Sequence, residues 1–277
     1  MTLSHEMIKD DNLTQFYFSE VDSVSTPIPA HWHNHLEIIC INRGSMTAYI
    51  NERSYILNVG DILIVNPRDI HTTHTHEDTH YFLLQIPTIH LERISPDWKL
   101  LHFAEYIPAS ADKDSLNSGL VNIFREFSRL NSTREKGHHL LLLVKLYEFL
   151  HLLYTKDSSV LSASIRSRTD RDVLRIEQIM QYAKKNCNRQ ITLAEVAEHI
   201  MVTPEYFCRL FKKYTGQTFF TYLAQIRLLN FYHDLIQTEE SITYLLDKNG
   251  ITNYKQFMSM FKKAYGTTPH RLRKNLK

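Results

Sequence analysis

The chain of 277 residues is poor in cysteine and has no apolar run long enough to cross a membrane. Its three cysteines, Cys40, Cys187 and Cys208, are odd in number and scattered, which argues against a disulfide framework and fits a reducing compartment. The first residues, MTLSHEMIKDDNL, contain no apolar core of a secretory signal. The most apolar stretch, residues 140–154, is too short for a bilayer and contains charged groups. We therefore expect a cytoplasmic protein without a membrane partner.

The net charge of +2 hides an asymmetry between the two ends of the chain. Residues 173–277 contain 16 Lys and Arg against 8 Asp and Glu, a net charge of +8, which leaves −6 on residues 1–172. A basic segment joined to an acidic one indicates a polyanion partner for the back of the chain only. A basic surface is as often exposed only to solvent. Charge alone therefore does not decide between a nucleic-acid partner and a solvated surface.

The chain divides into a strand-rich part and a helical part. Residues 25–87 contain short β-rich runs broken by Asn, Gly and Pro, a pattern typical of a small barrel or sandwich. The apolar spacing over residues 116–130 predicts a helix with one buried face. Residues 138–154 are apolar nearly all round, so this helix is either covered by its own domain and a second subunit, or is a single buried core helix.

A polar, Ser-rich stretch, residues 156–172, separates these parts from a helical remainder. We interpret it as a linker. The expected organisation is a domain at residues 1–155, the linker at 156–172 and a second domain at 173–277. The fold class is α+β, with an N-terminal β-barrel followed by a helical dimerisation segment, and an all-α C-terminal domain.

The helical remainder contains an internal repeat. YFCRLFKKYTG at residues 206–216 returns fifty positions later as QFMSMFKKAYG at residues 256–266. Each copy follows a short predicted helix, which is the plan of a helix-turn-helix unit. Phe207 and Phe211 lie four residues apart and should anchor one face inward, which leaves the polar positions of the same helix exposed.

Both copies carry motifs of a known family. RLFKKYTG and FKKAYGTTPHRLR resemble the two closing motifs of the AraC/XylS family of transcription regulators, and the resemblance covers about residues 173–275. It implies two recognition helices joined by a connecting helix, about residues 218–237, that enter successive major grooves about 34 Å apart. A helical bundle with a chance repeat is the alternative.

Three positions depart from that family's pattern. Met201 stands where the first turn usually has Gly, at a cost of about 1 kcal/mol if the position needs a positive φ. Leu246 replaces a small Ala in the leading helix of the second unit, so that this helix must lie farther from the helix against which it packs. Phe231 occupies a position of the connecting helix where a small residue is common.

The resemblance also implies which residues face DNA. Bases would be contacted in the first unit by Pro204, Glu205, Cys208 and Arg209. The matching face of the second unit is Asn253, Tyr254, Lys255, Met258 and Ser259, in which Lys255 offers a phosphate contact and Met258 an apolar wall for a thymine methyl. Phosphates would be contacted by two lysine pairs, Lys212 with Lys213 and Lys262 with Lys263. Arg209 can bind a guanine with two hydrogen bonds, whereas the second unit has no such fork-shaped donor. Two alternatives remain open: Asn253 reads an adenine, or Arg209 is held by an ion pair with Glu205.

The stretch HWHNHLE, residues 31–37, alternates His31, His33, His35 and Glu37. On one strand these side chains would share a face. The stretch resembles the first motif of the cupin fold, and GDILIVNPRDIH, residues 60–71, resembles the second through His71. The resemblance covers about residues 25–88 and is to the sugar-sensing cupin domain of the same regulator family, so it implies a cupin-like barrel.

Three interpretations of the histidine cluster stay open. His31, His33, Glu37 and His71 are a plausible shell for a divalent metal, the one cofactor that we consider. The same groups with His35, Trp32 and Tyr49 can instead line a pocket for an organic effector, for which the resemblance favours a carbohydrate. Histidines at the mouth of a barrel are also often merely solvated.

Taken together, these features predict a sequence-specific DNA-binding transcriptional regulator and not an enzyme. Its expected partners are double-stranded DNA, a small-molecule effector, a second copy bound through residues 116–154, and RNA polymerase as a further candidate. The alternative function is a metal-dependent cupin enzyme or a metal-responsive regulator. An enzyme would have no need of a duplicated DNA-reading domain.

Overall fold

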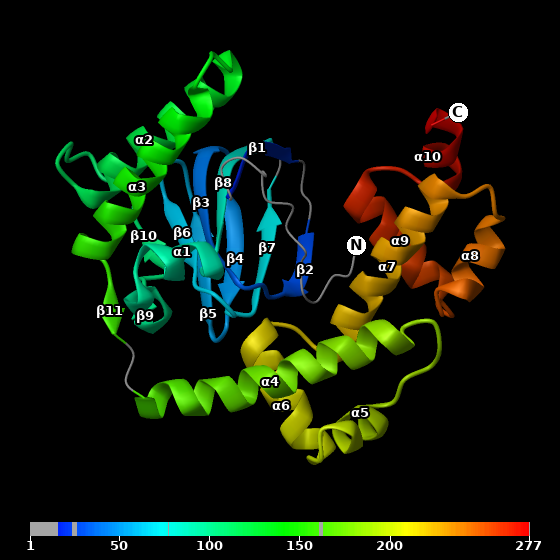
Figure 1. The fold of residues 1–277 in the computed structure, drawn as a ribbon. Helices are drawn as coiled ribbons and strands as arrows, with labels where there is room; N and C mark the ends of the chain where they lie inside the picture. The colour runs from blue at the N-terminus through cyan, green and yellow to red at the C-terminus, as the bar shows by residue number, and fades with distance from the viewer. Residues whose placement is uncertain (1–15, 24–26, 77, 161–162, 277) are drawn as a thin grey trace.

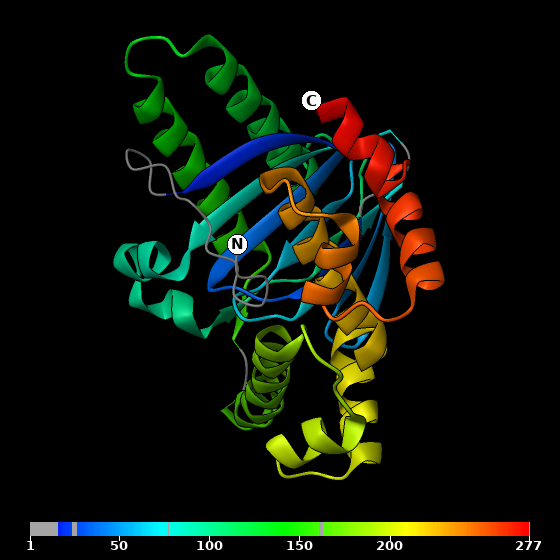
Figure 2. The same cartoon turned by 90° about the vertical axis from the view of Figure 1, so that its right-hand side faces the viewer.

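The computed structural model describes residues 16–23, 27–76, 78–160 and 163–276. We call residues 16–160 the front half and residues 163–276 the back half. In Figure 1 the two β-sheets of the front half lie between a helical hairpin on one side and the helices of the back half on the other. In Figure 2, turned by 90°, the C-terminal helices, in orange and red, lie in front of the sheets, and the hairpin, in green, lies at the upper left.

The front half contains two antiparallel sheets, with strand orders β1-β8-β3-β6-β10 and β2-β7-β4-β5, and a short β11-β9 pair. The described strands therefore form two facing sheets and do not close into one continuous barrel. The predicted cupin-like α+β class is confirmed. The strands are β1 Tyr17–Ser23, β2 Pro27–His31, β3 His35–Arg43, β4 Met46–Ile50, β5 Arg53–Leu57, β6 Ile62–Val65, β7 His71–Thr75, β8 Thr79–Pro87, β9 Leu101–His102, β10 Tyr106–Ile107 and β11 Ser159–Val160.

Alternation along β3 divides the front half into two apolar cores. Leu36 and Ile38 point to the helical side, whereas Ile39 and Ile41 point into the space between the two sheets. Successive side chains of a strand face opposite sides, so Glu37 shares the inner face with Ile39. A carboxylate thus lies between the sheets, in a position that would otherwise be apolar.

The helical hairpin of the front half covers the outer face of the five-stranded sheet. It consists of α2 Leu116–Thr133 and α3 His138–Lys156, after α1 Thr88–Ile94 and the 3-10 helix η1 Pro96–Leu100. The predicted apolar stripe of residues 116–130 is confirmed, and Phe124 stacks on Phe82 of the sheet with 5.8 Å between ring centroids. One face of α3 is buried, and the opposite face exposes apolar side chains.

The back half consists of seven helices within the described residues. They are α4 Ala163–Asn186, α5 Leu193–His199, α6 Pro204–Thr215, α7 Phe219–Gln237, α8 Ile242–Lys248, α9 Tyr254–Tyr265 and α10 Pro269–Leu276. Helix α4 begins inside the stretch 156–172 that its composition favours as a linker. None of the helices described in either half is both long and apolar enough to cross a bilayer.

Two helix-turn-helix units follow from local signals. Thr203 caps α6 and Asn253 caps α9, and each side chain accepts a hydrogen bond from a backbone amide three residues on. The prediction that Phe207 and Phe211 face inward is confirmed, because both are fully buried. The connecting helix α7 matches the predicted range 218–237 to within one residue.

The turn of the first unit holds a strained residue. Met201 has φ 54°, and the equivalent residue of the second turn is Gly250 with φ 64°. Both amides bond back to the preceding helix, Met201 N to Glu198 O and Gly250 N to Asp247 O. A Cβ on Gly250 would lie 2.6 Å from the carbonyl oxygen of Cys187, so only this second position excludes a side chain by contact.

We predict that Met201→Gly stabilises the protein by about 0.5–1 kcal/mol, because it removes the left-handed strain of a residue with a Cβ. Met201 is 92% exposed, so little packing is lost. The measurement is the free energy of unfolding in urea. Met201→Ala is the matched control and should give no gain; equal gains for both variants would show that strain at this residue is not the cause.

Candidate functional site

The stretch of residues 31–37 does not form one strand. β2 ends at His31 in the four-stranded sheet, and β3 begins at His35 in the five-stranded sheet. The prediction that a single strand aligns the four side chains is therefore wrong, because the chain crosses from one sheet to the other at residues 32–34. The crossing still brings His31, His33 and Glu37 together between the sheets.

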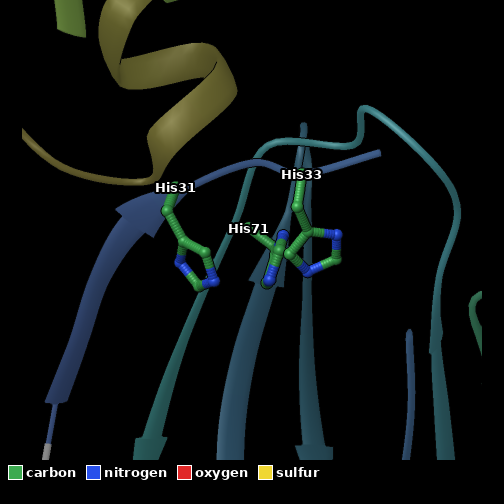
Figure 3. Close-up of side chains that lie close together, drawn as sticks. All are labelled: His31, His33 and His71. Carbon is green, nitrogen blue, oxygen red and sulfur yellow. The ribbon is translucent and has the colours of Figure 1, made fainter. Parts of the chain in front are cut away.

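His71 completes this group from β7. The ring centroids of His31 and His71 are 4.0 Å apart, and those of His33 and His71 are 5.0 Å apart. Figure 3 shows the three rings beside one another, with His31 at the end of β2, His71 at the start of β7 and His33 on the connection between β2 and β3. One nitrogen from each ring lies within 4.8 Å of the other two, and all three residues are buried. We call His31, His33, His71 and Glu37 the histidine cluster.

Backbone carbonyls orient two of the rings. His31 Nδ1 lies 2.9 Å from Pro29 O, and His71 Nδ1 lies 3.0 Å from Asp69 O. A carbonyl only accepts, so in the neutral rings Nδ1 carries the proton and Nε2 keeps its lone pair. Histidines that bind metals are commonly oriented by such a bond from the other ring nitrogen.

Glu37 supplies the negative charge of the cluster. Its Oε2 lies 3.0 Å from His33 Nε2 and accepts a hydrogen bond of 2.5 Å from Gln85 Nε2. Burial raises the pKa of this carboxyl, but the hydrogen bond with His33 and the charges of the three histidines outweigh burial and hold the pKa well below its usual range. Burial, followed by the charge of His31, lowers the pKa of His71.

The cluster thus presents imidazole nitrogens and an ionised carboxylate inside the protein. This donor set suits a first-row divalent cation such as Zn²⁺. The same groups, with the amide of Gln85, can also exchange hydrogen bonds with the hydroxyls of an organic ligand. Sequence reasoning did not identify Gln85, because it lies on β8 and only the sheet register places it opposite Glu37.

The other three residues predicted for the pocket lie elsewhere. His35 is half-buried and meets His33 edge-on at 5.7 Å between centroids. Trp32 is buried in an apolar core shared with the back half. Tyr49 points out of the sheet on the face opposite to the cluster, because it is paired with Thr72 and not with His71 in the register of β4 and β7. The structure therefore does not bring Tyr49 or Trp32 into the cluster.

Tyr49 instead contacts the first helix-turn-helix unit. Its hydroxyl donates to Lys213 O at 2.8 Å, and a Cβ added to Gly216 would lie 2.8 Å from the tyrosine ring. Beside it, Lys213 Nζ pairs with Glu52 Oε1 at 2.7 Å. We call Tyr49, Glu52, Lys213 and Gly216 the clamp. It uses one of the lysines predicted to bind phosphate, and no sequence pattern indicated Glu52.

The structure places most of the residues of the first unit that are predicted to contact DNA on the exposed face of α6. Glu205, Cys208, Arg209 and Lys212 are exposed, and Pro204 begins the helix. The guanidinium of Arg209 lies 5.6 Å from the centroid of the Tyr206 ring. Within the described residues Arg209 forms no ion pair with Glu205, so its donors are available to a ligand.

The second unit places its predicted residues less uniformly. Its exposed members are Asn253, Tyr254, Lys255, Ser259, Lys262 and Lys263. The side-chain oxygen of Asn253 is used as the cap of α9 and accepts from Gln256 N at 3.0 Å. Met258 is half-buried against the core of this unit, so less of it is available as an apolar wall.

Two family models match the chain. Residues 16–150 match the model of an AraC-like ligand binding domain, and residues 196–275 match that of a helix-turn-helix domain. The HTH-type transcriptional activator RhaS of Pectobacterium carotovorum is 22% identical over 90% of this chain and 88% of its own length. The bifunctional transcriptional activator/DNA repair enzyme AdaA of Bacillus subtilis is 35% identical over 35% of this chain and 46% of its own length. The crystal structure of ToxT from Vibrio cholerae is 14% identical, covers 95% of this chain and 98% of its own, and has a TM-score of 0.46.

The clamp predicts unequal effects of two glycine substitutions. Gly216 and Gly266 end equivalent helices with φ 70° and 67°, but a Cβ on Gly266 meets nothing within 4 Å. Alanine should therefore cost about 1 kcal/mol at both positions for the positive φ, and a further ~1–3 kcal/mol at Gly216 for the collision with Tyr49.

Urea unfolding of Gly216→Ala and Gly266→Ala measures this difference. In a Tyr49→Ala background the two alanine variants should cost the same, because the collision partner is gone. If they already cost the same with Tyr49 present, the clamp does not form in solution.

Proposed function

Because the chain belongs to the AraC family of transcriptional regulators, we propose that an effector bound at the histidine cluster controls how the back half binds DNA. The supporting observation is the position of Trp32 and Ile70. Each directly adjoins a residue of the cluster, and both are buried in one apolar core with α4, α6 and α7. Any rearrangement of His31 or His71 is thus passed to residues that hold the DNA-binding unit.

We propose a carbohydrate as the effector, from the family resemblance and from the many hydrogen-bonding groups of the cluster. A divalent metal is the second candidate. It is favoured by the convergence of three imidazole nitrogens, two of them on rings oriented by carbonyls. His31, His33 and His71 would hold the metal, with Glu37 as a fourth ligand.

Substitution of the cluster separates sensing from DNA binding. We expect His33→Ala and Glu37→Gln to abolish the change in DNA affinity caused by the effector and to leave DNA binding without effector unchanged, because neither side chain lies on the DNA-reading helices. His80→Ala, a histidine outside the cluster, is the control. The measurement is operator affinity by fluorescence anisotropy, with and without a panel of sugars.

The proposal that the histidine cluster binds a divalent metal predicts a further result with the same protein. Purified protein should hold close to one equivalent of metal at the cluster, and chelation should reproduce the two substitutions. If the metal-free protein still changes its DNA affinity on addition of a sugar, a metal is not the effector. Normal responses in both cluster variants would contradict the proposed site itself.

We further propose that the first unit reads sequence and that the second mainly holds the backbone. Arg209→Ala should flatten base preference at one or two positions of one half-site, by about 1–3 kcal/mol. Lys255→Ala should weaken all sequences alike and reduce the salt dependence by about one charge. Single base-pair changes across the operator measure both. Equal losses under the two units would contradict the asymmetry.

The exposed face of α3 supports dimerisation. Leu140, Val144, Tyr147 and Tyr154 are 58%, 59%, 47% and 39% exposed and follow the three-and-four spacing of one helix face. We propose that a second copy covers this face. Val144→Glu should give a monomer in light scattering, because a charge would be buried at the interface. Ile56→Glu, an exposed apolar position on β5, is the control and should remain dimeric.

The remaining proposals concern the domain boundaries, the direction of regulation and the cellular location. The division into residues 1–155, 156–172 and 173–277 remains our proposal for the domains. RhaS and AdaA are transcriptional activators by name, so we propose activation, with RNA polymerase as a partner in the cytoplasm. We propose no enzymatic activity, because the groups of the cluster are explained by sensing.

A further inference from the structure

A second group of metal-binding side chains lies outside the histidine cluster. Asp69 in the β6–β7 turn, His102 on β9 and Glu105 after β9 each place one donor atom within 4.8 Å of the other two. The segments that carry them are tied together by Asn66, whose side chain donates to Phe103 O at 3.0 Å and accepts from Phe103 N at 2.9 Å. The three donors are therefore held by ordered backbone.

The two carboxylates of this group are only partly compensated. Asp69 Oδ1 accepts from Asn51 at 2.8 Å, but Asp69 Oδ2 is shielded from solvent and accepts no hydrogen bond from the described residues. Glu105 is 8% exposed, and its Oε2 accepts from Tyr55 and lies 3.7 Å from Arg53. Two negative charges thus face one guanidinium whose side chain is 72% exposed.

A buried carboxylate oxygen without a partner carries a large desolvation cost. The neutral imidazole of His102 is the form that binds a metal. A cation placed among the three donors would remove the cost at Asp69 and use the lone pair of His102.

We propose that Asp69, His102 and Glu105 form a second cation site that binds a divalent first-row metal, Zn²⁺ or Mn²⁺. Two carboxylates and one imidazole suit these ions, because oxygen donors alone favour Mg²⁺ or Ca²⁺ and thiolates are absent from the group. The site shares no side chain with the histidine cluster and does not depend on the identity of the effector.

The position of this site connects it to the back half. His102 lies on β9, whose partner β11 immediately precedes α4 in the sequence, and Ser159 Oγ of β11 donates to His102 O at 3.0 Å. On the other side of the site, Arg68 adjoins Asp69 and pairs with Glu177 of α4 at 3.5 Å. A bound metal would join the two segments of the front half that attach to α4, and would stiffen this attachment.

Zinc titration of the full chain tests the site. The protein is stripped with a chelator, and Zn²⁺ is added in a calorimeter to wild type, Asp69→Asn, His102→Ala and His33→Ala. Asp69→Asn and His102→Ala should each lose one equivalent, or bind it more than about 100-fold more weakly, since loss of a second-shell partner alone costs about 10–100-fold. His33→Ala should keep that equivalent, because His33 belongs to the other cluster. Zn²⁺ titrations of Asp69→Asn and His102→Ala that match wild type would overturn the proposal.

Stability without metal separates binding from a structural role. Asp69→Asn keeps the acceptor for Asn51 and removes the uncompensated charge, so the stripped variant should melt at or above the wild-type temperature. Zn²⁺ should raise the melting temperature of the wild type by more than that of the variant, because the variant keeps only the histidine cluster. Glu105→Gln provides a second variant if His102→Ala does not fold. A stripped Asp69→Asn that melts lower than wild type, with an unchanged zinc titration, would assign Asp69 a structural role and reject the site.

Discussion

The apolar core shared by the two halves is the interaction on which the rest of the structure depends. Trp32, Ala30 and Ile70 of the front half are buried with residues of α4, α6 and α7. Burial of this kind is worth about 25 cal/mol per Å² of apolar surface and is not directional. The clamp supplies a specific contact between the halves, in which the ring of Tyr49 lies against Gly216 because that glycine has no side chain. Apolar packing holds the two halves together, and the clamp fixes the orientation of one half relative to the other.

The histidine cluster is adjacent to that core because of strand geometry. Trp32 lies between two histidines in the sequence, and Ile70 precedes His71. The polar groups of the cluster are buried, and their hydrogen bonds join His33 to Glu37, Gln85 to Glu37, and His31 and His71 to backbone carbonyls. A buried polar network is sensitive to a new ligand, since each group that changes partner leaves another to be satisfied. The two features together make the cluster suited to sensing.

The helix-turn-helix units were largely predictable, and the front half was predictable only in part. Helix caps, turn glycines and the burial of Phe207 and Phe211 depend on residues within one or two turns, so the pattern of the sequence contains them. The cluster was predicted for a partly wrong reason: residues 31–37 cross between two sheets, and the sheets bring His71 and Gln85 to Glu37. Tyr49 was assigned to the pocket because its type suits a ligand, but the register of β4 turns it to the other face.

The sequence by itself determined the class of the protein, the two DNA-reading units, the basic charge of the back half and the presence of a histidine-rich group. These are properties of composition and of spacing along the chain. Tertiary structure alone decided that Lys213 pairs with Glu52, that Asp69 meets His102 and Glu105, and that Trp32 packs against the back half. These contacts join residues tens to more than a hundred positions apart, and no local periodicity specifies them, because they arise only when separate layers pack against each other.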